Sequence, residues 1–423
     1  MDIKTLLRGN ESCACGQKHT CDVHYVELGD GVLTRLAEIC HGFHRIHIVS
    51  DQNTDRLAGD EVRKHLGSKV VSHTLFGKEV VIPDEVAIAR IEAEMADGVD
   101  FMIGIGSGVI NDLCKHLSFT HGIRYAIVAT APSMDGYASV GAALILGGMK
   151  VTLNARVPYA ILAESRVLAT APTEMLQSGY GDIVGKYSCL NDWRLAALLR
   201  GEYFCRTVYD TVMEVVKATE DTAQDILSRD KDAVCRLMEG LVTVGIMMSY
   251  VGNSRPASGS EHHLSHFFEI TGILNATPYY PHGIDVLYAS AVTAKLREQL
   301  IAMQPPFDAC RHDRTLWEKE IARIYTSASD GVIALQDKVG LYKEIDNERL
   351  AACWDAVCSI LREAPDAKKM RGFVESIGLN MAEFHAFYGE NVLFDAVRYA
   401  KDLKDRFTVL WLAYALGVGY HAS

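Results

Sequence analysis

The pattern of secondary structure in this chain changes near Pro172, and this change constrains the fold more than any other feature. Before that point, short β-type runs alternate with helical patterns. After it, proline and β-branched runs become rare and long amphipathic stretches dominate to the end. Alternating strands and helices are typical of a parallel sheet with right-handed crossovers, whereas amphipathic stretches alone predict packed helices. The sequence therefore predicts an α/β domain at 1–168 and an all-α domain at 169–423.

The elements expected in the α/β domain are short. The expected strands are Arg45–Ser50, Val70–Phe76, Asp100–Ile105 and Tyr125–Thr130, and the expected helices are Thr54–Leu66, Pro83–Ala96 and Ser107–Leu117. Ala143–Leu146 and Lys150–Asn154, joined by Gly147-Gly148-Met149, are expected to form a β-hairpin added to this sheet. In the helical domain we expect helices at Thr173–Leu199, Asp221–Tyr250, Ile284–Met303, Asp308–Val339 and Asn347–Glu363.

Length and charge exclude several classes of protein. A chain of 423 residues is too long for one core, and a net charge of −12 argues against a nucleic-acid binder. The N-terminus lacks the apolar core of a signal peptide, and the longest apolar run, near Gly240–Tyr250, is shorter than the roughly 20 residues that span a bilayer. We therefore expect a cytoplasmic protein with no nucleic-acid or membrane partner, in which the 11 cysteines are reduced.

Three histidines in the helical half are candidates for a metal site. His262 and His266 lie one helical turn apart and so share a face, and His282 follows sixteen residues later. Neutral imidazole binds divalent metals, and a catalytic site needs about three protein ligands and one open position. Asp182 is the best candidate for an acidic ligand. His263 is a second candidate beside His262, but helical phase favours His262.

Two loops at the ends of expected strands are candidates for binding a nucleotide. Gly104–Gly108 follows a strand and begins a helix, so its backbone N–H groups could approach a pyrophosphate. The third glycine of the Rossmann pattern is absent, and a tight turn without a ligand is an equally good interpretation. Thr130–Ser139 also lies at the carboxyl end of a strand, where ligands gather. Its hydroxyls and carboxylate are typical of helix caps too, and on its own the loop favours that interpretation.

Five segments, taken in order, carry a resemblance to a known family. They are GSGVIND at Gly106–Asp112, TAPSMDGYAS at Thr130–Ser139, GYGDIVGKYS at Gly179–Ser188, SRPASGSEHHLSH at Ser254–His266 and HG at His282–Gly283. With this order and spacing the chain resembles the iron-containing alcohol dehydrogenase and dehydroquinate synthase superfamily, and within it the sn-glycerol-1-phosphate dehydrogenase family. The resemblance covers about Arg45 to Val292, and the residues beyond match only as generic helices.

The resemblance implies a fold, an activity and a set of site residues. It implies a Rossmann-like nucleotide-binding domain, a helical domain around one divalent metal such as zinc or nickel, and a homodimer or larger homo-oligomer. The implied reaction is reduction of dihydroxyacetone phosphate with NADH or NADPH. The implied metal ligands are Asp182, His262 and His282. The residues implied to hold the dinucleotide are Asp51, Gly106, Ser107, Gly108, Val109, Asp112, Thr130, Ser133 and Ser139. Those implied to face the substrate are Asp135, Asp182 and His266, of which Asp182 and His266 are the implied catalytic residues.

Some residues near these motifs keep a second interpretation. Lys186, one turn after Asp182, could bind a substrate phosphate or pair with Asp182 or solvent. Arg255 is another phosphate candidate, although a surface position is its default. Two departures from the family pattern, Gly-Ser-Gly in the turn and Asn111 at an apolar position, leave the preference for NAD or NADP open.

A cluster near the N-terminus, Cys13, Cys15, His19 and Cys21, could bind zinc. Its spacing departs from the usual C-x₂₋₄-C knuckle, so a turn with reduced thiols is the favoured interpretation.

Two other activities compete on the same scaffold. One is a glycerol or polyol dehydrogenase without phosphate selectivity. The other is a dehydroquinate-synthase-like sugar-phosphate cyclase, although such enzymes usually carry Glu at the position of Asp182.

Overall fold

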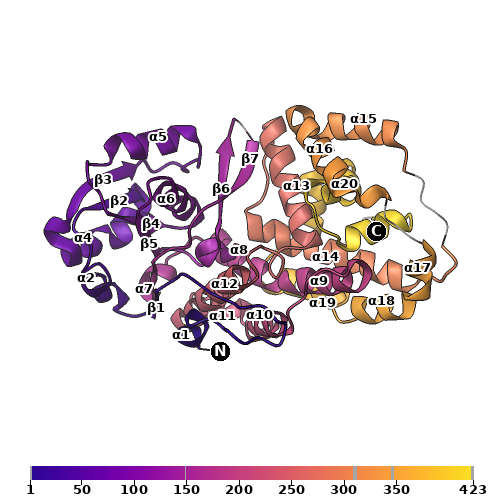
Figure 1. The fold of residues 1–423 in the computed structure, drawn as a ribbon, viewed down its shortest axis with the longest axis horizontal. Coiled ribbons are helices and arrows are strands. Elements are labelled where there is room, and N and C mark those ends of the chain that lie inside the picture. The colour runs from indigo at the N-terminus through magenta and orange to yellow at the C-terminus, as the bar shows by residue number, and fades with distance from the viewer. Residues whose placement is uncertain (1, 148, 308–311, 344–346, 421–423) are drawn as a thin grey trace. The chain divides into compact units, whose positions relative to one another are not determined.

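The computed structural model describes residues 2–147, 149–307, 312–343 and 347–420. The chain forms two compact units (Figure 1). Unit 1 comprises Met1–Ile183 and Asp210–Ser254, and unit 2 comprises Val184–Tyr209 and Arg255–Ser423. The chain therefore divides elsewhere than the expected boundary after residue 168. The reason is that α12 (Lys231–Val251), although it follows the change of pattern, packs against elements of the α/β unit.

Unit 1 is built on six parallel strands in the order β1-β8-β5-β4-β2-β3. The strands are β1 (Tyr25–Gly29), β2 (Ile46–Asp51), β3 (Val70–Phe76), β4 (Phe101–Gly106), β5 (Arg124–Ala129) and β8 (Ala160–Glu164). The four expected strands are confirmed within one residue at each end. The sequence pattern did not indicate β1 and β8, which pair with each other in parallel. Every residue of β4 and β8 is buried, as is typical of strands covered on both faces.

The expected hairpin forms, but its position was predicted wrongly. β6 (Gly141–Leu146) and β7 (Met149–Asn154) pair with each other as a separate antiparallel sheet, and the described residues show no pairing of either with the six parallel strands. The hairpin packs against α6 (Gly108–Thr120), where the backbone N–H of Ala143 donates to the Asp112 carboxylate at 3.2 Å. Contact with a helix instead of a strand edge keeps it out of the parallel sheet. Gly148 in its turn lies outside the described residues.

The strand order of unit 1 reverses between β2 and β4. The chain passes from β2 to β3 on one side, and then returns to build β4 and β5 on the other. In open parallel sheets, ligands bind outside the carboxyl ends of the strands at such a reversal. Here those ends are Asp51 and Gly106, and the Thr54 hydroxyl joins them by donating to the Ile105 carbonyl at 2.8 Å.

The remaining helices of unit 1 begin after strands or surround α12. They are α1 (Ile3–Leu7), α2 (Leu36–Ile39), α3 (Gln52–Thr54), α4 (Asp60–Leu66), α5 (Glu85–Glu94), α7 (Ser165–Leu168), α8 (Thr173–Val184) and α11 (Ala223–Leu227); α10 (Arg206–Thr219) begins in unit 2. α12 contains the apolar run near Gly240–Tyr250 and, at 21 residues, is longer than that run. Among the described residues it alone could cross a membrane by length and composition, but most of its side chains are buried, as in a core helix.

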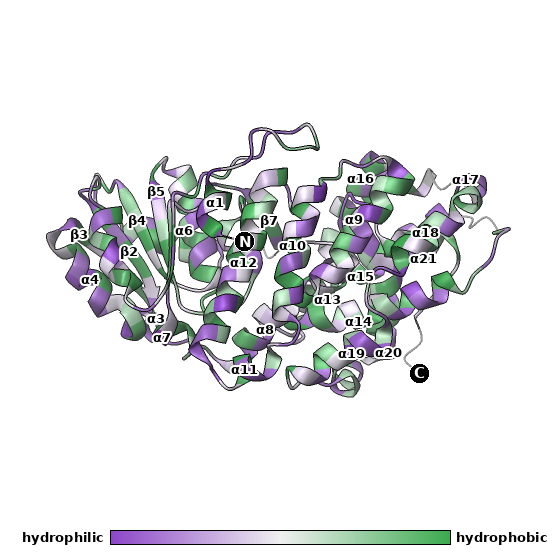
Figure 2. Ribbon diagram, turned by 90° about the horizontal axis from the view of Figure 1, so that it is seen from below, coloured by the Kyte–Doolittle hydropathy of each residue, from purple (hydrophilic) through white to green (hydrophobic). Residues whose placement is uncertain are grey.

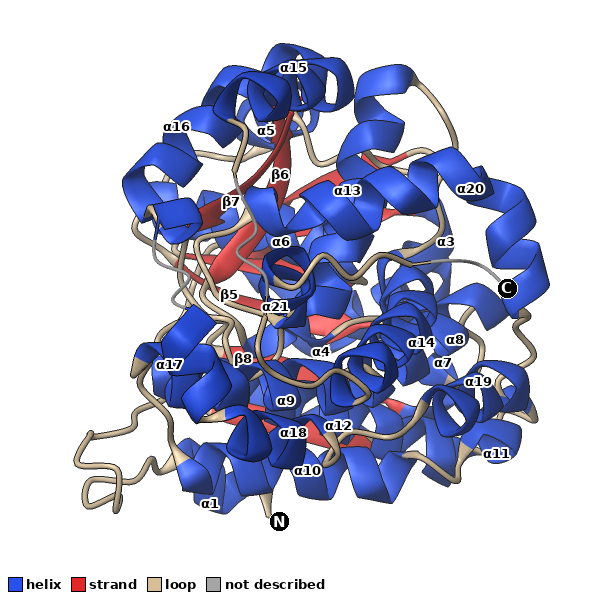
Figure 3. Ribbon diagram, turned by 90° about the vertical axis from the view of Figure 1, so that its right-hand side faces the viewer, coloured by secondary structure: helices blue, strands red, loops and turns tan. Residues whose placement is uncertain are grey.

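Unit 2 contains helices and loops, and its described residues include no strand (Figure 3). The prediction of a helical C-terminal part is confirmed. Figure 2 shows hydrophilic and hydrophobic residues alternating along these helices, as amphipathic packing requires. They are α9 (Lys186–Arg200), α13 (Ser260–Asn275), α14 (His282–Ile301), α15 (Arg314–Tyr325), α16 (Ser329–Val339), α17 (Asn347–Ala352), α18 (Trp354–Leu361), α19 (Ala367–Ser376), α20 (Met381–Tyr399) and α21 (Val409–Ala415). The expected helix at Asp308–Val339 is two helices, and its first four residues lie outside the described part.

Candidate metal centre and nucleotide-binding edge

Three histidine rings of unit 2 lie close together. His262 and His266 are on α13, and His282 is the first residue of α14. The ring centroid of His282 lies 5.0 Å from that of His262 and 5.4 Å from that of His266. Gly259 lets α13 begin here, because a Cβ at this position would lie 2.6 Å from the Cα of Cys189. The histidines singled out from the sequence therefore form one cluster.

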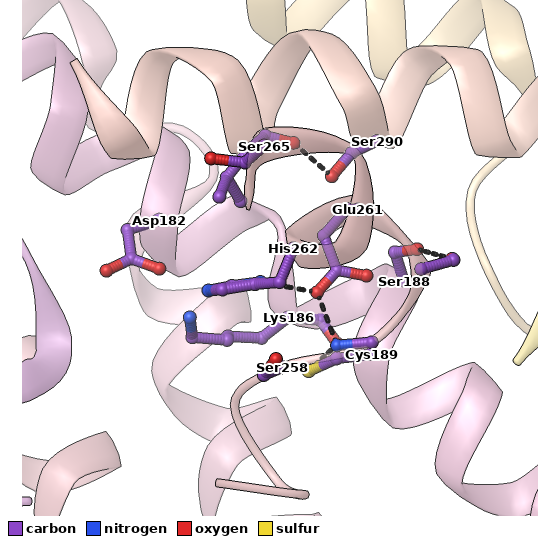
Figure 4. A network of polar contacts seen from close by, with 12 residues as sticks. Asp182, Lys186, Ser188, Cys189, Ser258, Glu261, His262, Ser265 and Ser290 are labelled. Atoms are coloured by element: carbon purple, nitrogen blue, oxygen red, sulfur yellow. Dashed lines mark hydrogen bonds and ion pairs between the residues drawn. The ribbon is translucent and has the colours of Figure 1, made fainter. Parts of the chain in front are cut away.

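Two hydrogen bonds fix the orientation of these rings. Nδ1–H of His262 donates to the Glu261 carboxylate at 2.7 Å (Figure 4), and Nδ1 of His282 lies 3.1 Å from the Ser265 hydroxyl. Metal-binding histidines commonly use one ring nitrogen in this way, which leaves the other for the ion. In both residues the hydrogen bond engages Nδ1, so Nε2 is the nitrogen that would bind a metal. Neither Glu261 nor Ser265 was predicted. The fold brings the His282 ring to Ser265, whereas Glu261 precedes His262 directly in the sequence, and its role depends on the side-chain orientation of the two residues.

Glu261 is a buried carboxylate that stays charged. Burial raises the pKa of this carboxyl. The hydrogen bond from His262, and a 2.8 Å hydrogen bond from the backbone N–H of Gly259, lower the pKa by more than burial raises it. The net pKa is below the ordinary value. A carboxylate behind the imidazole makes His262 a more basic ligand.

His263 lacks the hydrogen bond that orients the adjacent His262. It is fully buried, and neither ring nitrogen has a hydrogen-bond partner among the described residues. Burial, with the positive charges of Arg406 and Lys404, holds its pKa well below the usual range. His262 rather than His263 contributes to the histidine cluster.

Glu269 adds a carboxylate to the same region of unit 2. Its Oε2 lies 3.9 Å from Nδ1 of His266, and one donor atom from each of His266, Glu269 and His282 lies within 4.8 Å of the others. Glu269 was not among the ligands expected from the sequence, although its i,i+3 spacing from His266 was a usable signal. Imidazole and carboxylate donors together fit a divalent ion such as zinc, nickel or iron.

Asp182 and Asp135 lie together in unit 1. Asp182 is fully buried in the last turn of α8, two residues before unit 2 begins, and its Oδ2 accepts the backbone N–H of Asp135 at 2.9 Å. Gly179, one turn earlier, permits this approach, since a Cβ there would lie 1.8 Å from the carbonyl oxygen of Pro132. Two of the motif segments are therefore in direct contact.

The two candidate phosphate-binding cations of unit 2 are both buried, in different settings. Lys186 begins α9, and Figure 4 shows its amino group and the far end of the His262 ring pointing in the same direction. Arg255 is only 2% exposed, so the default of a surface position is wrong. Its guanidinium binds Glu202 at 2.7 Å and the carbonyl of Phe407 at 2.7 Å. Arg255 therefore braces the fold of unit 2.

The glycine-rich turn lies at the carboxyl end of β4, beside the reversal of strand order. Ser107 is the N-cap of α6 and makes no side-chain capping hydrogen bond. Ser107, Gly108 and Val109 are half-buried. Gly106 is required by packing, because a Cβ there would lie 2.5 Å from Ile110. The first turn of α6 thus presents backbone N–H groups at the edge where ligands gather.

The other residues implied to bind the dinucleotide already have structural partners. Asp51 caps α3, with its Oδ1 accepting the N–H groups of Asn53 and Thr54. Asp112 pairs with the buried Lys115 at 3.4 Å as well as binding the hairpin.

Three further residues of this set follow β5. The Ser139 hydroxyl donates to the carbonyl of Gly136 at 3.0 Å. Thr130, whose backbone N–H donates to the Gly106 carbonyl at 3.0 Å, lies next to the glycine-rich turn, and Ser133 is half-buried.

The chain is similar to known proteins of one family. Residues 27–172 match the family described as iron-containing alcohol dehydrogenase. The chain is similar to the glycerol-1-phosphate dehydrogenase (NAD(P)+) of Halalkalibacterium halodurans, with 31% identity over 70% of this chain and 76% of the relative. It is 28% identical to the protein of that name from Bacillus licheniformis, over 96% and 93% of the two chains.

Its fold is also similar to a solved structure, that of sulfoacetaldehyde reductase from Bifidobacterium kashiwanohense in complex with NAD+. The TM-score is 0.61 at 13% identity, and the match covers 94% of this chain and 97% of that one. The chain belongs to the glycerol-1-phosphate dehydrogenase family of the iron-containing alcohol dehydrogenases.

Proposed function

We propose that this protein is an NAD(P)-dependent, metal-dependent dehydrogenase that interconverts dihydroxyacetone phosphate and sn-glycerol 1-phosphate. The observation that carries the proposal is the histidine cluster of unit 2, with ring nitrogens oriented by Glu261 and Ser265. Relatives that match nearly the whole chain are named for this activity. We further propose a cytoplasmic homodimer or larger homo-oligomer.

The proposed metal ligands are Nε2 of His262, Nε2 of His282 and the carboxylate of Asp182. Both histidines have Nδ1 held by a protein oxygen, and Asp182 is buried. The alternative set, in which His266 and Glu269 join His282, uses side chains that are each 17% exposed and leaves Glu261 without a role. A divalent ion, zinc or nickel, supplies Lewis-acid stabilisation of the charge that develops on the C2 oxygen of the substrate.

His266 is proposed to deliver the proton in the reduction. When bound, the dinucleotide would supply a hydride from nicotinamide C4 to substrate C2, and His266 would give one proton to the C2 oxygen, so that ketone, NAD(P)H and a proton would give alcohol and NAD(P)+. Imidazole titrates near neutral pH and so suits this transfer. The Glu269 carboxylate, 3.9 Å from Nδ1, would stabilise the ring in its protonated form by charge.

The remaining polar groups are proposed to bind the two ends of the substrate. The buried Lys186 ammonium is assigned to the phosphate, because it is a cation whose amino group points in the same direction as the His262 ring (Figure 4). Asp135 is assigned to a substrate hydroxyl. Its backbone N–H already orients Asp182, so both acids would respond together to the bound substrate.

The dinucleotide is proposed to bind at the carboxyl ends of β2, β4 and β5. Its pyrophosphate would accept hydrogen bonds from the N–H groups of Ser107, Gly108 and Val109, aided by the α6 dipole. Thr130, Ser133 and Ser139 would line the nicotinamide side. Asp51 would lie near the adenosine ribose. Asp112 would support the loop after β5 through Lys115, whose ammonium donates to the carbonyls of Gly136 and Gly141 at 2.8 Å.

A steady-state assay of dihydroxyacetone phosphate reduction tests the function. The rate is measured with NADH and with NADPH, before chelation, after chelation and after restoring zinc or nickel. We expect turnover that chelation abolishes and metal restores, with one nicotinamide oxidised per substrate, a stoichiometry that a cyclase would not give. Absence of a rate with every divalent ion and both nucleotides would overturn the proposal. Faster oxidation of glycerol than of glycerol 1-phosphate would assign a polyol dehydrogenase instead.

A further inference from the structure

We infer that the N-terminal loop of unit 1 holds a second metal ion, zinc, through the thiolates of Cys13 and Cys15 and the imidazole of His19. One donor atom from each of these residues lies within 4.8 Å of the others, and Sγ of Cys15 is 3.3 Å from Nε2 of His19. This site is separate from the dehydrogenase chemistry and does not depend on it. It replaces the interpretation of the cluster as a simple turn with reduced thiols.

The backbone of the loop places these three side chains. The Gly16 N–H donates to the Cys13 carbonyl at 2.9 Å, and Gly16 has a φ of +80°, so a tight turn follows the two cysteines. Asn10 and His19 exchange two backbone hydrogen bonds of 2.9 Å, which return the chain to the start of the loop. The donor atoms therefore meet because of main-chain pairing that the sequence spacing did not reveal.

The His19 ring is oriented as a metal ligand. It is fully buried, its Nδ1–H donates to the carbonyl of Tyr250 at 2.8 Å, and it stacks on the Tyr250 ring with centroids 5.2 Å apart. Donation from Nδ1 leaves Nε2 unprotonated, on the side of the Cys15 thiol. A hydrogen bond from the second ring nitrogen to a backbone carbonyl is a common feature of protein zinc sites.

Cys21 belongs to the sequence motif but not to the site. Its thiol is absent from the group of mutually close donors that contains Cys13, Cys15 and His19. It is therefore a matched control: a cysteine of the same loop whose replacement should leave the metal in place.

The chemistry of the donors selects zinc. Two sulfurs and one imidazole nitrogen are typical of tetrahedral zinc sites, and hard cations such as Mg²⁺ prefer oxygen. The ten cysteines that the structure describes are all reduced, consistent with thiols available to a metal. The loop supplies three of the four positions, and the fourth ligand is a water or a further side chain.

The ion would fasten the N-terminal segment to α12. Tyr250, which binds His19, is on α12, and its hydroxyl donates to the Leu6 carbonyl of α1 at 2.5 Å. α1 has five residues, too few for a helix that is stable without tertiary contacts. A zinc ion on His19 would reinforce this set of contacts, so the site is structural.

Metal analysis of the full-length protein tests the inference. We expect zinc in the wild-type protein, loss of one zinc per chain in a Cys13→Ser/Cys15→Ser variant, and no loss in Cys21→Ser. The His282→Ala variant should keep this zinc, which separates it from the proposed catalytic ion. Dehydrogenase activity of the double variant should stay within a few-fold of wild type. Equal zinc content in the double variant and the wild type would overturn the inference, whether or not the enzyme reduces dihydroxyacetone phosphate.

Cobalt substitution and alkylation give readouts that survive a poorly folding variant. Wild-type protein grown with cobalt in place of zinc should show thiolate-to-cobalt absorption in the near ultraviolet, lost in the double variant and kept in Cys21→Ser. In wild-type protein alone, Cys13 and Cys15 should resist iodoacetamide until zinc is removed. Alkylation at the same rate with and without zinc, or a disulfide joining the two in freshly purified protein, would overturn the site. The number of thiolates, from the absorption intensity, identifies the fourth ligand.

Discussion

The two units orient a histidine in the same way but surround it with different donors. In unit 1, Nδ1 of His19 binds a backbone carbonyl and Nε2 faces thiols. In unit 2, Nδ1 of His262 binds the carboxylate of Glu261, and the ring lies beside the imidazole of His282. The hydrogen bond behind the ring sets the tautomer in both cases. The neighbouring donors decide what a bound ion can do.

Accessibility separates the two sites further. His19 is fully buried, and two sulfurs beside it leave little room for a substrate. The side chains of His266 and Glu269, next to His282, are each 17% exposed, so small molecules can reach this part of the cluster. A sulfur-rich, closed site is typical of structural zinc, and a nitrogen and oxygen site with an open position is typical of catalysis.

The largest effect is expected from His282→Ala. Loss of a ligand should remove the catalytic ion and with it several kcal/mol of transition-state stabilisation, so kcat/KM should fall by about 10³-fold or more. Circular dichroism should show an unchanged fold. Assay and metal analysis on the same samples check both points. Substantial retained activity would show that the proposed ligand set is wrong.

A smaller effect is expected from His266→Asn. If His266 transfers the proton, kcat should fall by about 10²-fold while the metal content stays at the wild-type level. Glu269→Gln is the matched test of the alternative ligand set, and it should change the metal content little. Loss of the ion from both variants would instead assign His266 and Glu269 as ligands, and Asp182 would lose that role.

Removing the charge of Glu261, which binds Nδ1 of His262, should change the affinity for the metal ion more than the rate of turnover. Glu261→Gln keeps a hydrogen-bond acceptor but removes the charge, so the affinity for the ion should fall by about 10- to 100-fold. Titration of the chelated protein with zinc, followed by activity, measures this shift. Activity at saturating zinc should return to near the wild-type value. A rate that excess metal cannot restore would mean that Glu261 acts in the chemical step.

The sequence predicted most of the elements because their signals are local. Hydrophobic runs gave β2 to β5, and helical spacing placed His262 and His266 on one face. β1 was not predicted from the sequence because only its second residue is buried, and its pairing partner β8 lies more than a hundred residues away. A strand at a sheet edge without alternation has no local signature.

The candidate sites were predicted less completely, for the same physical reason. The role of Arg255 depends on a tertiary partner, Phe407, and that of Glu261 depends on the side-chain orientation of the adjacent His262; no spacing rule contains either. The N-terminal cluster shows the limit most directly. Its C-x-C spacing argued against zinc, whereas the Asn10–His19 pairing of the folded loop brings the imidazole to the thiols.

The smallest effect on catalysis is expected at a third kind of histidine, His47 in β2. Its two ring nitrogens face hydroxyls, Ser72 at 2.8 Å and Thr74 at 3.3 Å, so neither is left for a metal. Burial, assisted by the nearby His73, lowers the pKa of His47 to about 4 from 6.5. The unfolded chain therefore takes up a proton first as the pH falls. Stability present above pH 6.5 should be lost progressively down to pH 4, by up to about 3 kcal/mol.

His47→Gln should remove this pH dependence and leave turnover unchanged. Amide hydrogen exchange of the β2 and β3 segments, at pH 7 and pH 4.5 after correction for intrinsic rates, measures the local stability. The wild-type segments should lose more protection on acidification than those of the variant. Equal losses of protection would place the acid-sensitive group elsewhere. Loss of metal or of activity in the variant would show that His47 also supports a bound ion, although both of its ring nitrogens already contact hydroxyls.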